Sequence, residues 1–368
     1  MAPLRIGVDA RHLAAGRGVA RYTAAMLGAL ARSGYDELRL LVPGRGPLAL
    51  DPPRAPDVAV IRHRLPSRAL FGAAAVVRRP ALDALTGGDV VWLPAPAPVA
   101  VGRAPYVLTL HDLSWVHHPE WFTRYERLWH RLGRLRALAA GASCVVAVSA
   151  ATRDDALATW GLDPARVRVV RSGVPEPAPP APRPPWLPDR YVLAVGALEP
   201  RKDPELLVEA HALARRRGLD AELVLAGTGR LASAVRRPGV QVIEDAGGPL
   251  LQRLYADALA LAAPARHEGF GFAPLEAALA GTPSVVADLP VYGETLGEAA
   301  LRAPAGDVAA WSDALLRIAT DRALADRLAA QAAAAARALS WERAAGELRA
   351  ALEEAAATGD ARGRGAAR

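Results

Sequence analysis

The sequence predicts an α/β protein built from two doubly wound domains, and three observations lead to this prediction. Short apolar runs alternate with segments of helical periodicity along both halves of the chain. The runs are continuously apolar, which is typical of parallel strands that are buried on both faces. A chain of 368 residues is too long for one ordinary core and fits two domains. Eight prolines between Pro175 and Asp189 mark the boundary.

The apolar runs give the expected order of strands and domains. Residues 1–175 form the first domain, residues 176–189 a stiff, extended linker in which proline forbids helix and ladder pairing, and residues 190–339 the second domain. Residues 340–357 are expected to form a capped helix that packs back on the first domain, and residues 358–368 a disordered tail. Strands are expected at residues 4–9, 38–42, 58–61, 90–93, 106–110, 144–148 and 167–170, and then at 191–195, 222–226, 240–243, 258–262 and 284–287.

Charge is spread unevenly along the chain. Residues 1–175 carry 23 Arg against 13 Asp and Glu, whereas the remainder has a balance of −3. A basic first half suggests an anionic partner, such as a membrane surface, a lipid phosphate or a nucleic acid, or else a basic composition with no such partner. Interleaved stacking aromatics and a known nucleic-acid module are missing, so we expect no nucleic acid.

The number of cysteines and the lengths of the apolar runs indicate the redox state and the cellular compartment. One cysteine, Cys144, excludes an internal disulfide. No run approaches the roughly 18 apolar residues of a membrane helix, and the first residues enter a strand pattern directly instead of a signal peptide. We therefore expect a cytoplasmic protein.

Lys202 is the single lysine beside 44 arginines. It follows Arg201 in the segment Gly196–Asp203, directly after the apolar run Tyr191–Val195. In open α/β sheets, ligands bind at the carboxyl ends of strands, and two adjacent cations suit a diphosphate. A solvated surface pair is the alternative. The scarcity of lysine favours a site at which arginine does not serve.

A second motif carries two carboxylates, Glu268 and Glu276, with Gly269 and Gly271 between them. The pattern predicts a strand, a glycine loop and a helix whose free amides bind phosphate, while the carboxylates accept sugar hydroxyls. Two solvated carboxylates around a turn are the alternative.

Two features of the first half have alternative interpretations. The loop with Gly16 and Gly18 precedes a predicted helix, but the spacing of its glycines does not fit a dinucleotide-binding turn. Either the loop holds an acceptor with the help of Arg17 or Arg21, or it is a plain flexible loop. Residues 124–140 predict one basic amphipathic helix that binds an anionic membrane or packs its apolar stripe on the sheet.

These motifs together resemble the family-4 retaining glycosyltransferases of GT-B fold, and the resemblance spans about residues 4 to 356. The Glu-x7-Glu pattern with its Gly-Phe-Gly core is specific in combination. The matching segments are Gly196–Lys202, Ala226–Gly229, Glu268–Glu276, Gly281–Val286, His111–Trp115 and Val148–Thr152.

The resemblance implies a role for each matching residue. Arg201 and Lys202 hold the donor diphosphate, Glu276 binds the ribose, Glu268 lies near the donor sugar, and His111 lies beside the reacting sugar. Many members have Gly-Arg where this chain has Gly196-Ala197, which leaves open which arginine touches phosphate. The resemblance also places the donor against Gly196, Gly269, Phe270 and Gly271 with the base near Ile243, and the acceptor near Gly16, Gly18, Arg21 and Asp112.

The resulting hypothesis is a retaining hexosyltransferase that moves a sugar, GDP-mannose being the first guess for the donor, to a glycan or polyprenyl-linked glycan. UDP-sugars stay open. No Asp-x-Asp motif occurs, so we expect neither metal nor other cofactor. The expected setting is surface-polysaccharide synthesis, at the inner face of the cell membrane. The alternatives are a nucleotide-sugar epimerase and a non-catalytic basic binding protein.

Overall fold

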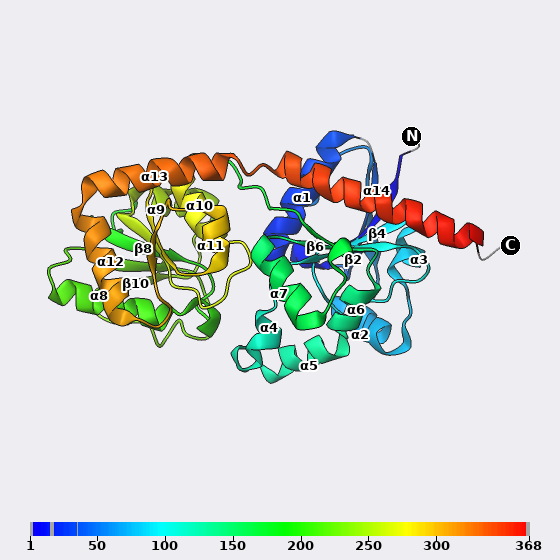
Figure 1. Cartoon of the computed structure of the whole chain (residues 1–368), viewed down its shortest axis with the longest axis horizontal. Coiled ribbons are helices and arrows are strands. Elements are labelled where there is room, and N and C mark those ends of the chain that lie inside the picture. Colours follow the sequence, from blue (N-terminus) through cyan, green and yellow to red (C-terminus); the bar gives the residue numbers. More distant parts are fainter. Residues whose placement is uncertain (1–2, 15–17, 35, 366–368) are drawn as a thin grey trace. The chain divides into compact units, whose positions relative to one another are not determined.

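The computed structural model describes residues 3–14, 18–34 and 36–365 and divides into two compact units. Unit 1 comprises residues 1–173 together with 340–368, and unit 2 comprises residues 174–339. Both units have a parallel sheet covered by helices, as the apolar runs predict (Figure 1).

The sheet of unit 1 has seven parallel strands in the order β3-β2-β1-β4-β5-β6-β7. The strand order reverses between β1 and β4, which makes this the switch point of a doubly wound fold. The central strands are largely buried, because helices cover both faces of the sheet, whereas no residue of the edge strand β3 is buried. The strands are β1 (Arg5–Asp9), β2 (Glu37–Pro43), β3 (Val58–His63), β4 (Val90–Leu93), β5 (Tyr106–Leu110), β6 (Cys144–Ala147) and β7 (Val167–Val169).

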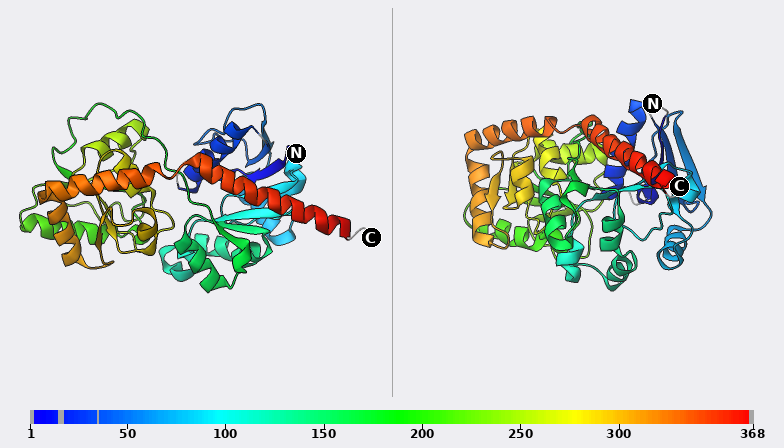
Figure 2. Two further views of the ribbon diagram at one scale, coloured as in Figure 1. Left: turned by 45° about the horizontal axis from the view of Figure 1, so that its top comes forward. Right: turned by 45° about the vertical axis from the view of Figure 1, so that its right-hand side comes forward.

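Helices of unit 1 connect these strands, and the C-terminal helix α14 joins them. Helix α14 lies against α1 and near β5 and β4, so the end of the chain belongs to the same unit as its beginning (Figure 2). The Arg349 guanidinium fixes it through an ion pair with the buried Asp36 carboxylate at 2.6 Å. The helices are α1 (Val19–Ser33), α2 (Ser67–Val77), α3 (Leu82–Thr86), α4 (Ser114–His117), α5 (Arg124–Leu132), α6 (Leu135–Gly141), α7 (Ala150–Trp160) and α14 (Trp341–Gly365), with 3-10 turns η1 (Arg11–Ala14), η2 (Pro119–Trp121) and η3 (Pro164–Arg166).

The sheet of unit 2 has six parallel strands in the order β10-β9-β8-β11-β12-β13. Its switch point lies between β8 and β11, and the apolar core forms around these central strands. The strands are β8 (Tyr191–Val195), β9 (Glu222–Ala226), β10 (Val240–Ile243), β11 (Ala260–Ala263), β12 (Ser284–Ala287) and the short β13 (Leu301–Ala303), which the sequence analysis missed.

The helices of unit 2 cover both faces of this sheet. Helix α12 packs on α8, and α13 packs on α10 (Figure 1). The helices are α8 (Pro204–Arg216), α9 (Gly248–Asp257), α10 (Phe272–Leu279), α11 (Pro290–Thr295), α12 (Val308–Thr320) and α13 (Arg322–Arg337), with the 3-10 turn η4 (Pro200–Lys202).

Three expectations differ from the structure. The helix expected over residues 124–140 is two helices, because Gly133 ends α5 and Arg134 adopts a left-handed φ of 45°. The proline-rich segment, expected as a stiff, extended linker between the domains, is part of unit 2: the Ala181 amide donates to the Pro249 carbonyl at 2.9 Å. Residues 358–365 continue α14 instead of forming a disordered tail, because a helix that is already formed in the alanine-rich stretch before them can propagate; residues 366–368 lie outside the described residues.

Candidate active site

Two loops meet at the switch point of unit 2. Strand β8 leads into the 3-10 turn η4, which carries Arg201 and Lys202, and the neighbouring strand β11 leads into the loop with Glu268. Because both strands are parallel and adjacent, their carboxyl ends deliver the two loops to the same edge of the sheet. Residues 66 positions apart in the sequence thereby come into contact.

Backbone and side-chain bonds join these two loops. The Arg266 amide donates to the Arg201 carbonyl at 2.9 Å, and the Arg201 guanidinium donates to the His267 carbonyl at 3.0 Å. Asp203 is the N-cap residue of α8, but its side chain makes no capping hydrogen bond: its buried carboxylate binds the Arg266 guanidinium at 2.6 Å. This ion pair joins the cationic loop to the segment that follows β11.

The cations of the site converge on one carboxylate. The Lys202 ammonium forms an ion pair with Glu268, and the Arg201 guanidinium lies 4.0 Å from the same carboxylate. The side chains of Lys202 and Glu268 are 26% and 13% exposed. The pair therefore lies within a partly enclosed site, where charges interact more strongly than they do in bulk water.

Glycines allow the neighbouring backbones to approach closely. The Gly196 amide donates to the Ala226 carbonyl at 3.0 Å, and the Leu198 amide donates to the Thr228 carbonyl at 2.9 Å. A Cβ atom on Gly227 would collide with the Gly196 carbonyl oxygen. The loops after β8 and β9 are thus held side by side, which explains why both motifs contain glycine.

The start of helix α10 completes this edge. Gly271 precedes the helix with a φ of 85°, a conformation that side chains disfavour. A Cβ atom there would lie 2.6 Å from the ring of Tyr292. Phe270 is buried, and Glu276 is buried further along the helix, where its carboxylate accepts a hydrogen bond from the Tyr255 hydroxyl at 2.9 Å.

A small cavity of about 40 Å³ lies among these groups. Lys202, Glu268 and Tyr292 border it, together with the backbone of Gly196 and Gly271. Tyr292 was missed by the sequence analysis, and burial followed by the nearby Glu268 charge raises its pKa well above the ordinary value, so its hydroxyl stays protonated. Its segment carries no local signal, because its position depends on α11 folding over the loop.

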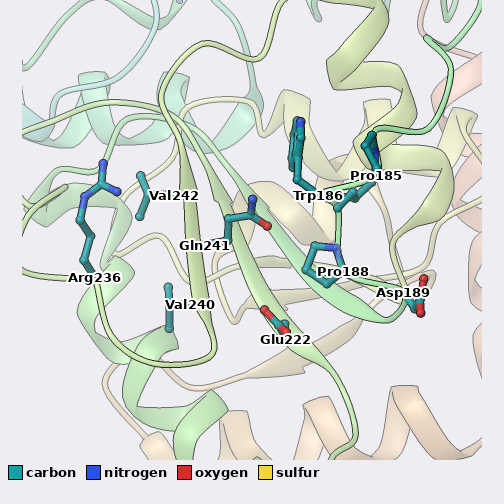
Figure 3. A pocket seen from close by; sticks show the side chains of 10 residues that line it. Pro185, Trp186, Pro188, Asp189, Glu222, Arg236, Val240, Gln241 and Val242 are labelled. Atoms are coloured by element: carbon teal, nitrogen blue, oxygen red, sulfur yellow. The ribbon is translucent and has the colours of Figure 1, made fainter.

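A larger hollow of about 610 Å³ lies elsewhere on unit 2. Figure 3 shows Trp186, Gln241 and Arg236 around it, near the edge strand β10 and the beginning of β9. None of the site residues expected from the sequence borders this hollow. Size alone therefore does not identify the site.

His111 follows the carboxyl end of β5 in unit 1. Its Nε2 lies 2.8 Å from the Pro94 carbonyl, an acceptor, so Nε2 carries the hydrogen in the neutral ring and Nδ1 can accept. Burial lowers the pKa of His111 below its usual value. Tyr22 contacts it edge-on at 4.7 Å between ring centroids. The ring is thereby held neutral and oriented.

The remaining acceptor-side residues belong to the same unit. Asp112 is engaged locally, because its carboxylate accepts hydrogen bonds from the Ser114 amide at 2.9 Å and hydroxyl at 2.6 Å. Gly18 precedes α1 with a φ of 49°, and Arg21 is exposed on the first turn of that helix. Gly16 lies outside the described residues.

A buried polar cluster near the end of β1 was also missed. The Asp9 and Arg11 side chains form a buried ion pair at 2.6 Å, and Arg11 donates to the Pro98 carbonyl at 3.1 Å. Burial lowers the pKa of the adjacent His12 to about 4. The position of Asp9 at the end of a strand pattern was the available signal.

The structure thus gathers the predicted donor residues at one edge of unit 2, where Ile243 also ends its strand. The predicted acceptor-side residues that it describes lie in unit 1. In the described part of the chain, no three His, Cys, Asp or Glu side chains are grouped so as to bind a metal ion. Over the same residues, no helix is both long and apolar enough to cross a membrane.

In both sheets the strand order reverses at a central switch point, and the loops singled out from the sequence follow the carboxyl ends of strands. This arrangement is that of two Rossmann-like domains. Comparison with known families agrees: residues 16–176 match the family "Glycosyltransferase Family 4", and residues 189–321 match "Glycosyl transferases group 1". The chain belongs to the group 1 glycosyltransferases of GT-B fold, which confirms the resemblance drawn from its motifs.

Two relatives with named activities are similar to part of the chain. The chain is 36% identical over 218 residues to a D-inositol 3-phosphate glycosyltransferase of Actinosynnema mirum, covering 52% of each protein. It is 25% identical over 223 residues to an O-antigen chain mannosyltransferase of Salmonella typhimurium, covering 57% of this chain and 60% of that protein. The chain thus spans only about half to three fifths of the length of these relatives.

Solved structures share the fold. A sucrose-phosphate synthase from Thermosynechococcus elongatus superimposes with a TM-score of 0.73 at 19% identity, over 96% of this chain and 100% of that one. The structure of WaaG, a glycosyltransferase involved in lipopolysaccharide biosynthesis, superimposes with a TM-score of 0.68 at 16% identity, over 91% and 96% of the two chains.

Proposed function

We propose that this protein transfers a hexose from a nucleoside diphosphate sugar to a glycan or lipid-linked glycan, with retention at the anomeric carbon. The observation that carries the proposal is the pair of cations, Arg201 and Lys202, beside Glu268 at the switch point of unit 2. This is where doubly wound sheets bind nucleotides. Family membership supports the reaction class.

The departing diphosphate needs positive charge as the bond to the sugar breaks. In our proposal, Lys202 and Arg201 supply it, and the first amides of α10 add the partial positive charge of a helix N-terminus. This arrangement requires no metal. Gly269, Phe270 and Gly271 bring the backbone amides against the donor, Glu276 receives the ribose, and the base lies near Ile243.

The proposed stereochemistry rests on the state of Glu268. Its carboxylate forms an ion pair with Lys202, which suits a group that orients the lysine and the donor sugar better than it suits a nucleophile. The acceptor then attacks from the face that the diphosphate leaves, and a phosphate oxygen receives the acceptor proton. The inverted covalent intermediate of a double displacement is not formed.

His111 is proposed to orient the donor sugar. A neutral ring whose Nε2 is committed to the Pro94 carbonyl presents Nδ1 as an acceptor for a sugar hydroxyl. Gly18, Arg21 and Asp112, with Gly16, would contribute to the acceptor side.

Donor and acceptor are proposed from the relatives. GDP-mannose is the first choice, since one relative is named an O-antigen chain mannosyltransferase, with UDP-sugars as the second. A polyprenyl-linked glycan is the proposed acceptor, and D-inositol 3-phosphate is worth testing because another relative is named for it. We place the protein in the cytoplasm, at the inner face of the membrane.

The test begins with thermal shifts in GDP-, UDP- and ADP-sugars, because a ligand at 100 times its dissociation constant stabilises the folded state by about 2.7 kcal/mol. The stabilising donor is then incubated with glycan acceptors, and NMR reads the anomeric configuration of the product. A product of retained configuration, formed in the presence of a chelator, supports the proposal. An epimerised free sugar nucleotide would reveal an epimerase, and absence of any donor shift would favour a binding protein.

A further inference from the structure

The apolar stripe of helix α5 is open to solvent. Every side chain of α5 is at least partly exposed, and Tyr125, Leu128 and Leu132 are 50%, 53% and 37% exposed. Trp129, on the same helix, packs against the core of unit 1. Packing on the sheet, one alternative from the sequence, therefore accounts for Trp129 and leaves the other three side chains unexplained.

Other residues of the same helix help to line a groove, which we call the α5 groove. It has a volume of about 650 Å³ and lies among α4, α5 and α6. Trp115, Val116 and Leu135 contribute apolar surface, while Arg127 and Arg131 project from α5 along it. The left-handed turn at Arg134 separates the two helices and adds a third arginine to its lining. The groove thus combines an apolar surface with cationic walls.

Helix α2 extends the same surface. It packs beside α5 (Figure 1), and the Arg68 guanidinium lies 5.1 Å from the centre of the Tyr125 ring. Val76 and Val77 at its end are 72% and 64% exposed. Large apolar side chains exposed to this degree on two helices that contact each other indicate an interaction surface.

Charge decides what kind of partner this surface fits. Residues 124–141 contain five arginines and one acidic residue, Glu126, whose carboxylate caps its own helix through Thr123. All five arginines are exposed. A second copy of the same surface would be repelled, and a nucleic acid would leave the apolar side chains uncovered. Cationic side chains around exposed apolar ones match an anionic lipid bilayer.

We propose that the surface of α2 and α5, with the α5 groove, is a binding site for anionic phospholipid. Tyr125, Leu128 and Leu132 enter the boundary between headgroups and acyl chains, one acyl chain lies along the groove, and Arg127 with Arg131 bind the lipid phosphate. This inference rests on the membrane setting proposed above and assigns it to specific residues. Lipid binding occurs on unit 1, whereas the proposed donor site lies on unit 2.

The test measures cosedimentation of the whole protein with vesicles. We expect binding to phosphatidylcholine vesicles that contain about one third phosphatidylglycerol, weak binding to pure phosphatidylcholine, and loss of binding at high salt. The Arg127→Gln/Arg131→Gln variant should bind about 25-fold more weakly, at roughly fivefold per arginine. Leu128→Ser should weaken binding about tenfold, because its apolar side chain no longer enters the bilayer.

The matched control is Arg216→Gln/Arg237→Gln, which removes the same charge from exposed positions of unit 2 and should bind vesicles like the unchanged protein. Circular dichroism confirms folding of each variant, and a thermal shift with the sugar nucleotide reports the donor site separately. Equal binding by the α5 variants and the unchanged protein would overturn the lipid site. So would arginine-dependent binding of single-stranded RNA with no binding to vesicles. If the sugar nucleotide gives no thermal shift while the protein still binds vesicles, only the proposed sugar transfer is refuted.

Discussion

Replacing Lys202 by methionine tests the electrostatic basis of the proposed site. Methionine keeps much of the side-chain volume and removes the charge. Two unit charges about 4 Å apart interact by roughly 4 kcal/mol at the effective dielectric constant of a protein surface. The substitution also leaves Glu268, which is 13% exposed, facing the donor diphosphate with Arg201 at 4.0 Å.

We therefore expect Lys202→Met to lower kcat/KM by about 10²- to 10³-fold, the usual loss for one group that stabilises a developing anion. The fall should be larger in kcat than in ground-state donor binding. Glu268→Gln in the same background removes the repulsion, so the double variant should lose about 1–2 kcal/mol less than the sum of the single variants.

The assay is steady-state transfer at saturating acceptor, with donor affinity from calorimetry and the melting temperature as a folding check. The control is Arg322→Gln, which removes a cation from a mostly exposed position on α13 of the same unit and should leave turnover unchanged. Undiminished turnover of Lys202→Met would refute the assigned role. Strict additivity in the double variant would show that Glu268 does not act through the lysine.

Three further predictions concern Lys202, His12 and Gly271. Lys202→Arg should keep the charge yet lose activity by about tenfold, because a planar guanidinium fits poorly beside the 40 Å³ cavity; steady-state kinetics checks this. Burial lowers the pKa of His12 to about 4, below its unfolded value near 6.5, so the unfolded chain takes up a proton at a higher pH than the folded protein does. The free energy of unfolding should therefore fall by about 3 kcal/mol as the pH is lowered from 6.5 to 4. Melting temperatures from pH 7 to 4 should show a smaller slope in His12→Leu, and an unchanged slope would contradict the assignment. Gly271→Ala should destabilise unit 2 by about 2–4 kcal/mol in urea unfolding, whereas Gly281→Ala, with the same φ of 85° but open space around it, should cost about 1–2 kcal/mol; equal effects would exclude the clash with Tyr292.

Much of the fold could be predicted because parallel sheets leave a strong local pattern. Tyr191–Val195 and Glu222–Ala226 are strands with the bounds expected from their apolar runs. Short or weakly apolar elements gave less signal: β13 has three residues and was missed. The break between α5 and α6 depends on Gly133, where a Cβ atom would lie 2.6 Å from the Leu135 side chain, a contact that helical periodicity does not reveal.

The sequence predicted the charged side chains of the candidate site, and the tertiary structure added the side chains that surround them. Lys202 stood out as the single lysine of the chain, and Glu268 and Glu276 stood out by their spacing around two glycines. Tyr255 and Tyr292 gave no such signal, since each reaches its partner only after separate helices have packed.

The sequence by itself determined the class of fold, the two domains and the residue types of the proposed sugar-nucleotide site, because each strand and helix shows its own pattern of apolar residues. Only the tertiary structure decided that β8 and β11 are neighbours, and therefore that Lys202 and Glu268 share a charge pair. It also decided which side of α5 meets solvent. Strand order and helix orientation depend on contacts between distant segments, and the pattern of neighbouring residues does not reveal those contacts.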